Sequence, residues 1–339
     1  MLLMLSPKQR GGNTNRRVRA NRRQAGSRGT NQVCWHYLRR ARHSGQNCPE
    51  SLELKARAFM HSRAQLANGF RRLGVGACDM VMLHASVRAV GEIAGGPDQI
   101  HLALKDVITR EGTLMMYASC PRYYDEVRRG NLSEEQEQEV LEKLPAFDPL
   151  TARAARDNGT LAEFLRTYPD SRVNSHVARF VVWGKQADYL ISRQPWNYAF
   201  GLHSPLDRFL GRDGKILLLG SDHDAVTFLH YVEHVAEIPG KRIARFQVPV
   251  EEDGRRVWRD MEEFDTSGDG VHANWPRDFF AKIVDAYLTG TGNQGARVGD
   301  AMSYVFGARG LLDFALPLME AVALDPSAAD NLSKRDGHL

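Results

Sequence analysis

Three residues within a span of five positions have side chains that could carry out chemistry. His230, Glu233 and His234 spell the pattern H-x-x-E-H, by which some zinc peptidases hold their metal. The same residues could instead form a metal-free site, in which His230 accepts a proton from a substrate while Glu233 holds its ring. A zinc site needs at least one more protein ligand, and no pattern among the downstream acidic residues selects one. The proton-transfer site is therefore favoured and zinc is the alternative.

These residues are predicted to lie on a helix that follows a buried strand. Residues 215–221, KILLLGS, have the apolar run of a strand, and a helical pattern covers residues 224–238 with Asp224 as its N-cap. On such a helix His230 and Glu233 lie one turn apart on the same face. The alternative is that they are ordinary polar residues on a solvated helix face.

The rest of the chain alternates strand and helix patterns. This alternation predicts an α/β fold with a central, largely buried β-sheet flanked by helices. The expected strands are residues 80–86, 113–119, 176–184 and 215–221, followed by a hairpin of residues 242–250 and 255–265. Further helices are expected near residues 279–288 and 311–322.

The length and composition of the chain are those of an ordinary globular protein. The chain has 339 residues, of which 42% are hydrophobic and 25% charged, and it contains no apolar run of the roughly 18 residues that would span a bilayer. The four cysteines are scattered, with no C-x-x-C pair, which suits a reducing compartment. We therefore expect a cytoplasmic protein without a membrane partner.

Charge divides the chain into unlike parts. Residues 1–50 contain eleven Lys and Arg but a single acidic residue, and we expect them to form a disordered basic extension. This extension could bind nucleic acid, act as an organellar address or come from an upstream start site. Residues 51–323 are the expected folded domain and 324–339 a flexible tail. The part beyond residue 50 is mildly acidic, which favours cationic small molecules over nucleic acid.

Polar residues also follow two of the predicted strands. Ser86 and Arg88 come directly after the first strand and precede a glycine-rich loop, where amides and a guanidinium could meet an anionic cofactor. Tyr117, Asp125 and Glu126 accompany the second strand, where an acidic loop could receive a cation. Each segment could also be a plain exit from a strand into a loop.

Taken together, these segments resemble the aminoglycoside 3-N-acetyltransferase family, antibiotic acetyltransferases that do not share the Gcn5-related fold. The resemblance covers roughly residues 52–323. The matching pieces, in the family's order, are LGVGACDMVMLHASVRAVGEIAGG, EGTLMMYAS, FDP, NSH, HSPLDRF, GKILLLGSDHDAVTFLHYVEHVAEIP and FDTSG. It implies the family's own acetyltransferase fold and transfer of an acetyl group from acetyl-CoA to the 3-amino group of an aminoglycoside, without a metal.

The resemblance also implies roles for particular residues. His230 is the expected general base, supported by Glu233. The residues expected to bind acetyl-CoA are Ser86, Val87, Arg88, Ser175, His176 and Thr227. The residues expected to line the site of the cationic antibiotic are Tyr117, Asp125, Glu126, Asp148, Glu233 and Asp269.

Two departures from the family pattern concern the substrate wall. Many members continue YAS with Trp-Asp, whereas this chain has Cys120 and Pro121, so the usual acidic contact is replaced. Where the family has Arg-Ser and His-Pro, this chain has Asn174 and Val177. The antibiotic spectrum is therefore open, and acetylation of a different primary amine is the second alternative.

Overall fold

The computed structural model describes residues 60–125, 127, 130, 132–266 and 270–332. The predicted basic extension of residues 1–50 lies outside this part of the chain. Glu126 and Asp269, both expected in the antibiotic site, also lie outside it. Nothing in the described structure therefore tests these three expectations.

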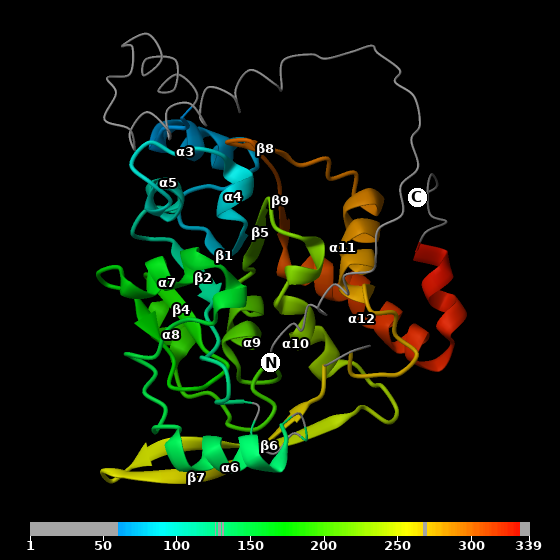
Figure 1. Cartoon of the computed structure of the whole chain (residues 1–339). Helices are drawn as coiled ribbons and strands as arrows, with labels where there is room; N and C mark the ends of the chain where they lie inside the picture. Colours follow the sequence, from blue (N-terminus) through cyan, green and yellow to red (C-terminus); the bar gives the residue numbers. More distant parts are fainter. Residues whose placement is uncertain (1–59, 126, 128–129, 131, 267–269, 333–339) are drawn as a thin grey trace, which may run out of the picture.

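A seven-stranded mixed sheet forms the centre of the molecule (Figure 1). Its strands run in the order β3-β4-β2-β1-β5-β9-β8; β2 and β5 lie parallel to β1 on either side of it, and the other neighbouring pairs are antiparallel. The bounds are β1 Met80–Ala85, β2 Thr113–Tyr117, β3 Arg172–Val173, β4 Phe180–Gly184, β5 Lys215–Leu219, β8 Ala296–Val298 and β9 Ala301–Gly307. The predicted fold class is confirmed.

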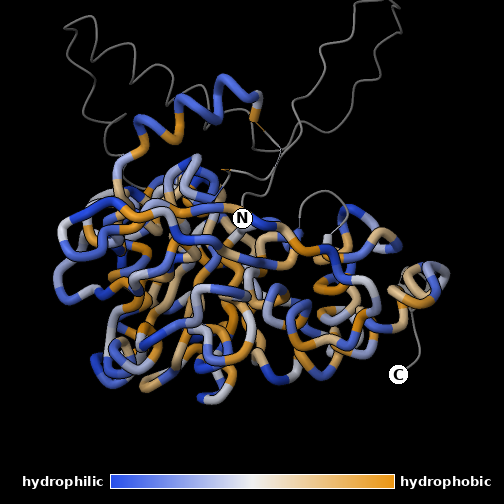
Figure 2. Tube along the Cα trace, turned by 90° about the horizontal axis from the view of Figure 1, so that it is seen from below, coloured by the Kyte–Doolittle hydropathy of each residue, from blue (hydrophilic) through white to orange (hydrophobic). Residues whose placement is uncertain are grey.

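Helices cover both faces of this sheet. Alternate residues of β1 point to opposite sides, so that Met80 and Met82 join one hydrophobic core while Val81 and Leu83 join the other. Burial on both faces explains why the strands have continuous apolar runs, and the hydrophobic stretches lie mainly inside the molecule (Figure 2). Packed on the Val81 side are α3 (Arg63–Arg72), α5 (Asp98–Ile108) and α7 (Thr160–Thr167); on the Met80 side are α8 (Ala187–Ile191), α9 (Pro205–Leu210), α10 (Phe228–Val235), α11 (Phe279–Gly290) and α12 (Ala308–Leu324).

A two-stranded hairpin extends from one end of the molecule. It consists of β6 (Ile243–Glu252) and β7 (Arg255–Phe264) and lies beside α6 (Glu134–Lys143) at the bottom of Figure 1. Arg256 joins the two by donating to the carbonyl oxygens of Leu141, Glu142 and Leu144 at the end of α6. The inner end of the hairpin packs into a third small core, so its position relative to the sheet is fixed by side chains.

The predicted helix of residues 224–238 is shorter than expected. Residues 223–225 form a 3-10 helix, η2, and α10 begins only after Thr227 and ends at Val235. Asp224 is therefore not its N-cap, which was predicted wrongly. Val226 separates the two helices because its buried side chain joins the core while its backbone leaves the helical region. Ala236, buried at the other end, likewise adopts an extended backbone.

The predicted strand of residues 176–184 begins only at Phe180. Side chains of the preceding residues occupy the backbone groups that a ladder would use: Asn174 donates to the carbonyl of Ala178 and accepts from the amide of Phe180, and His176 accepts from the amide of Ala178. The strands β8 and β9 were not predicted at all. No helix within the described ranges is long and apolar enough to cross a membrane.

Candidate active site

The helix α10 places His230 and Glu233 in direct contact. One helical turn separates them, and the Nδ1 atom of His230 lies 2.6 Å from the Oε2 atom of Glu233. Both side chains are buried, with exposures of 7% for His230 and 1% for Glu233. The pair is therefore not part of a solvated helix face. It is a buried histidine–carboxylate dyad, as the spacing predicts.

Aromatic rings surround the imidazole of His230. Its ring centroid lies 5.5 Å from that of Phe200 and 4.9 Å from that of Phe280. Burial disfavours charged forms, so it lowers the pKa of His230 to about 3 and raises the pKa of the Glu233 carboxyl to about 8. An imidazole in this environment is uncharged at neutral pH, so only one of its two ring nitrogens carries a proton.

The second ring nitrogen of His230 is available to accept a proton. No hydrogen bond reaches its Nε2 atom from the described part of the chain, whereas Nδ1 is held by Glu233. When Glu233 is ionised it accepts the Nδ1 proton, which leaves the lone pair on Nε2. The geometry thus suits a general base whose tautomer is set by the carboxylate.

His234 has no nitrogen left for a metal. Its Nδ1 atom lies 2.6 Å from the carbonyl oxygen of His230, and its Nε2 atom lies 2.5 Å from the Oε1 atom of Glu263. Among the described residues, no three His, Cys, Asp or Glu side chains form a group that could hold an ion. The donor geometry therefore disfavours the zinc alternative of H-x-x-E-H.

The residues expected to bind the cofactor fall into two groups. Ser86 is the N-cap residue of the short helix α4 (Val87–Val90), and its amide donates to the carbonyl of Leu219 at the end of β5. Arg88 is exposed on α4, and Thr227 is the residue before α10. The first group thus lies where parallel strands end, which is the usual place for ligands in α/β sheets, and the exposed guanidinium suits a phosphate.

Ser175 and His176 form the second group, in a pocket of about 290 Å³. Neither Ser86 nor His230 lines this pocket, whose walls are Ser175, His176, Arg193, Gln194, Trp196 and Arg259. Both ring nitrogens of His176 are used by the backbone: Nδ1 accepts from the amide of Ala178, and Nε2–H donates to the carbonyl of Trp196. The side chain of His176 therefore stabilises the conformation of its own loop.

Tyr117 and Asp148, two of the residues expected to contact the antibiotic, make contacts within the protein itself. The Tyr117 ring packs between Phe180 and Phe200, and burial raises the pKa of its hydroxyl. Asp148 is exposed, and its carboxylate accepts from the amide of Leu150 and the hydroxyl of Thr151. Asp148 thus stabilises its own turn, and only Tyr117 is linked to His230, through the shared neighbour Phe200.

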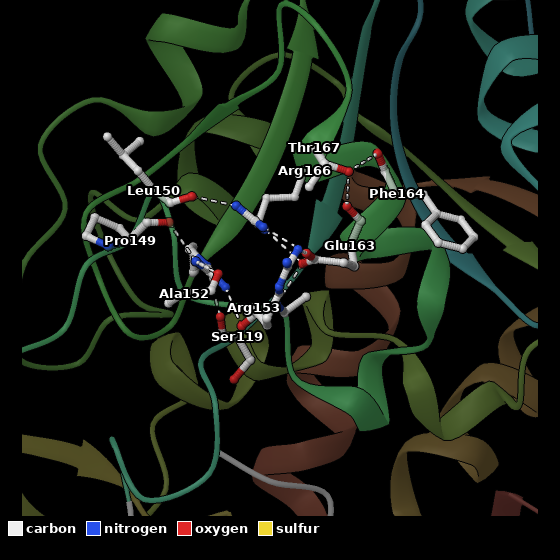
Figure 3. A network of polar contacts seen from close by, with 11 residues as sticks. Ser119, Pro149, Leu150, Ala152, Arg153, Glu163, Phe164, Arg166 and Thr167 are labelled. Carbon is white, nitrogen blue, oxygen red and sulfur yellow. Dashed lines mark hydrogen bonds and ion pairs between the residues drawn. The ribbon is translucent and has the colours of Figure 1, made fainter. Parts of the chain in front are cut away.

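The segment carrying Asp148 is held by one buried cation. Arg179 on the approach to β4 is fully buried, and its guanidinium donates to the carbonyl oxygens of Ser119, Pro149, Ala152 and Arg153. These carbonyl groups converge in Figure 3, next to the Glu163–Arg166 pair, whose Arg166 donates to Leu150. The position of the loop of residues 149–153 is therefore fixed by side chains of α7 and by Arg179, which lies just before β4.

Two further buried residues were not singled out from the sequence. Glu263 lies on β7, where nothing in the sequence distinguishes it from the neighbouring Glu262. His84, near the end of β1, is buried, and its Nε2 atom has no partner among the described residues. The HAS segment after the first strand contained a signal for His84, whereas the contact between Glu263 and His234 depends on how the hairpin packs.

The fold and the dyad together describe an α/β protein with a buried histidine–carboxylate pair at the centre of its candidate site. Comparison with known proteins gives a more specific result: the sequence model of the aminoglycoside 3-N-acetyltransferase family matches residues 82–320. An aminoglycoside N(3)-acetyltransferase III from Pseudomonas aeruginosa is 40% identical over 265 residues, which cover 77% of this chain and 94% of that protein. An aminoglycoside N(3)-acetyltransferase VII from Streptomyces paromomycinus is 35% identical, covering 76% and 91%.

Solved structures agree with this result. The enzyme AAC-IIIb, in a binary complex with CoASH, superposes with a TM-score of 0.71 at 37% identity over 77% of this chain and 97% of that one. The enzyme AAC-VIa bound to sisomicin gives a TM-score of 0.71 at 34% identity over 77% and 98%. The chain belongs to the aminoglycoside 3-N-acetyltransferase family and is an acyltransferase, so the predicted family and enzyme class are confirmed.

Proposed function

We propose that this enzyme transfers the acetyl group of acetyl-CoA to the 3-amino group of aminoglycoside antibiotics, with His230 as the general base. The observation that carries the proposal is the buried dyad, with the Nδ1 atom of His230 held at 2.6 Å by Glu233 and its Nε2 atom left open. The family fold supports it, because relatives with this fold are named for the same acetyl transfer.

The chemistry requires a base because an ammonium group is not a nucleophile. The bound amine attacks the thioester carbonyl carbon, the carbon–sulfur bond breaks, and the thiolate of CoA leaves to become CoASH. His230 Nε2 takes the proton that the attacking nitrogen loses, and Glu233 stabilises the imidazolium that forms. The imidazolium then gives this proton to the departing thiolate, which forms CoASH and regenerates the neutral ring. No covalent enzyme intermediate is needed, since the two substrates can be held together and react directly.

We assign the CoA end of the site to Ser86, Val87 and Arg88, and we assign Thr227, the N-cap residue of α10, to it as well. Support comes from the place of Ser86 at the carboxyl ends of β1 and β5 and from the exposed Arg88 guanidinium, which suits phosphate oxygens. AAC-IIIb, of the same fold, is described in complex with CoASH. We assign no CoA contact to His176, because the backbone occupies both of its nitrogens.

We assign the antibiotic end to acidic groups, with Glu233 of the dyad, Asp125, Glu126 and Asp269 as candidates. An aminoglycoside is a polycation, so carboxylates favour its binding, and AAC-VIa is described with sisomicin bound. One observation favours a narrower spectrum or a different primary amine. Cys120 is buried in an apolar cluster with Tyr124, so its position offers no acidic contact.

Acetyl transfer should release CoA thiol only when a suitable antibiotic is present, and EDTA should not affect the rate. We expect turnover with at least one of a panel of aminoglycosides, and we expect the product to carry its acetyl group on the 3-amino nitrogen. Thiol release and NMR of the product measure these two results. A spermidine sample is the control for a general amine acetyltransferase. Loss of activity in EDTA, restored by zinc, would favour the metal alternative instead.

The rate should also rise with pH through about 8. Below the raised pKa of Glu233, its protonated carboxyl donates to Nδ1, which places the remaining ring proton on Nε2 and blocks the base. Above that pKa, Glu233 accepts the Nδ1 proton and Nε2 is free, so activity is gained as pH increases. The measurement is kcat/KM for one antibiotic between about pH 6 and pH 9.

The variant Glu233→Gln separates this effect from titration of the antibiotic's own amine. Glutamine cannot ionise, so the limb due to the dyad should disappear while the limb due to the substrate amine remains. A wild-type profile that stays flat over this range, or that matches that of Glu233→Gln at every pH, would contradict the proposed role of Glu233.

A further inference from the structure

A second buried histidine–carboxylate pair lies beside the dyad. His234, one turn after His230 on α10, has its Nε2 atom 2.5 Å from the Oε1 atom of Glu263 on β7. Both side chains are almost completely buried, with exposures of 2% for His234 and 7% for Glu263. Burying two ionisable groups costs free energy unless something compensates for it. The acetyl-transfer chemistry proposed above gives this pair no role that would do so.

The hydrogen-bond partners fix the protonation state of this pair. The Nδ1 atom of His234 faces the carbonyl oxygen of His230 at 2.6 Å and must donate, because a carbonyl has no proton to give. Glu263 also accepts from the backbone amides of Ala199 and Phe264. Burial alone would raise the pKa of Glu263, but the hydrogen bond and charge of His234, with these amides, hold it below its usual value. A carboxylate of Glu263 can only accept from the Nε2 atom of His234, so in this geometry both ring nitrogens of His234 act as donors and the ring carries a positive charge.

The pair also connects three separate parts of the chain. It joins α10 to β7, and through the amide of Ala199 it holds the turn that precedes Phe200, whose ring lies against both His230 and His234. His234 additionally fixes the carbonyl of His230, while Lys241 donates to the carbonyl of His234. The backbone and one aromatic neighbour of the general base are thus set by this pair.

We propose that His234 and Glu263 are positioning residues for acetyl transfer, which hold His230 in place and present a fixed positive charge beside it. This inference rests on the proposed role of His230 as the general base. The positive charge opposes protonation of the neighbouring dyad, so more of the enzyme has an unprotonated Nε2 atom at neutral pH. The pair would thus extend activity toward lower pH.

Within the described residues, only a few charged groups lie around His230. Glu233 and His234 lie on its own helix, Glu263 faces it from β7, and Lys241 follows the helix. Burial lowers the pKa of His230, and the charge of His234 lowers it further, while Glu263 opposes this effect. The charge of His234 likewise lowers the pKa of Glu233. Both directions agree that removing the charge of His234 moves the titration of the dyad to higher pH.

The other helices packed around α10 supply no further charge at this point within the described residues. On α9, Asp207 accepts from the hydroxyl of Tyr231, and on α12, Glu320 accepts from the amide of Glu237. The nearest contact from α11 is the apolar ring of Phe280. His234 and Glu263 are therefore the groups to test.

The experiment compares pH profiles of kcat/KM for acetyl transfer in the wild type, His234→Gln, Glu263→Gln and the double variant. We expect the acidic limb to move up by about one pH unit in His234→Gln. The shift should be smaller in Glu263→Gln, because the lost charge of Glu263 itself raises the pKa of both dyad residues. The rate of His234→Gln should then fall about tenfold at neutral pH and change little above about pH 10. The double variant should show no larger shift than His234→Gln, because both substitutions remove the same ion pair.

The control is His61→Gln, which disrupts another histidine–carboxylate contact, 3.0 Å from His61 to Asp300, next to α3 and β8. Its profile should not shift. An equal loss of rate at every pH in folded His234→Gln would show a purely structural role and overturn the inference, while an active His230→Ala enzyme would overturn the proposed function itself. If His234→Gln does not fold, nitrogen-15 NMR of wild-type His234 decides: two protonated ring nitrogens at neutral pH support the inference, and a neutral ring overturns it.

Discussion

Replacing His230 with alanine should lower kcat/KM for acetyl transfer about 10³-fold, the range in which a positioned general base contributes. Among the described side chains, none can take over the role of the His230 Nε2 atom. The Nδ1 atom of His230 is hydrogen-bonded to Glu233, and both ring nitrogens of the neighbouring His234 are already hydrogen-bonded. The rate of thiol release from acetyl-CoA measures this loss. The KM for acetyl-CoA should change little, because Ser86, Val87 and Arg88 of the predicted CoA site lie on or beside α4.

Added imidazole provides a test that a structural defect would not pass. His230→Ala leaves a space lined by the rings of Phe200 and Phe280, and free imidazole in that space should restore part of the rate, increasingly as pH rises. The matched control is His101→Ala, which removes another buried histidine bound to a carboxylate at the same spacing, Asp98 at 3.2 Å on α5. An equal loss of activity in the control would show that the effect is general damage to the fold.

The dyad could be predicted because it is local. His230 and Glu233 lie three residues apart on one helix, and helix geometry alone brings such side chains together. The bounds of that helix could not be predicted, since Val226 leaves the helical conformation in order to bury its side chain. Periodicity describes which residues favour a helix, but the packing of single apolar residues determines where it begins and ends.

The partners that come from distant elements could not be predicted. Glu263 reaches His234 only because the hairpin folds back against α10, and the sequence separation of 29 residues contains no sign of that contact. The antibiotic-site residues are a related case. The family resemblance implied that Asp148 lines the antibiotic site, but its carboxylate accepts hydrogen bonds within its own turn. Composition identifies a charge, whereas its availability depends on local hydrogen bonds.

Arg179→Met should lower the free energy of unfolding by about 3 kcal/mol. Methionine fills a similar volume but donates nothing, so the carbonyl oxygens of Ser119, Pro149, Ala152 and Arg153 each lose a hydrogen bond in a buried site. Removal of the buried charge returns part of this cost, because the guanidinium is no longer kept from water. The loss should exceed this gain, since four acceptors are left without their donor.

Urea unfolding of Arg179→Met, Arg179→Lys and Arg110→Met measures this difference. Lysine keeps the charge but lacks the planar fork that reaches several carbonyls at once, so its stability should lie between those of wild type and Arg179→Met. Arg110 is exposed and lies 3.8 Å from Asp170, and its replacement should change stability by no more than about 0.5 kcal/mol. A loss below about 1 kcal/mol in Arg179→Met would mean that water can replace the guanidinium among these carbonyls. The loop of residues 149–153 would then be held mainly by Glu163 and Arg166 on α7.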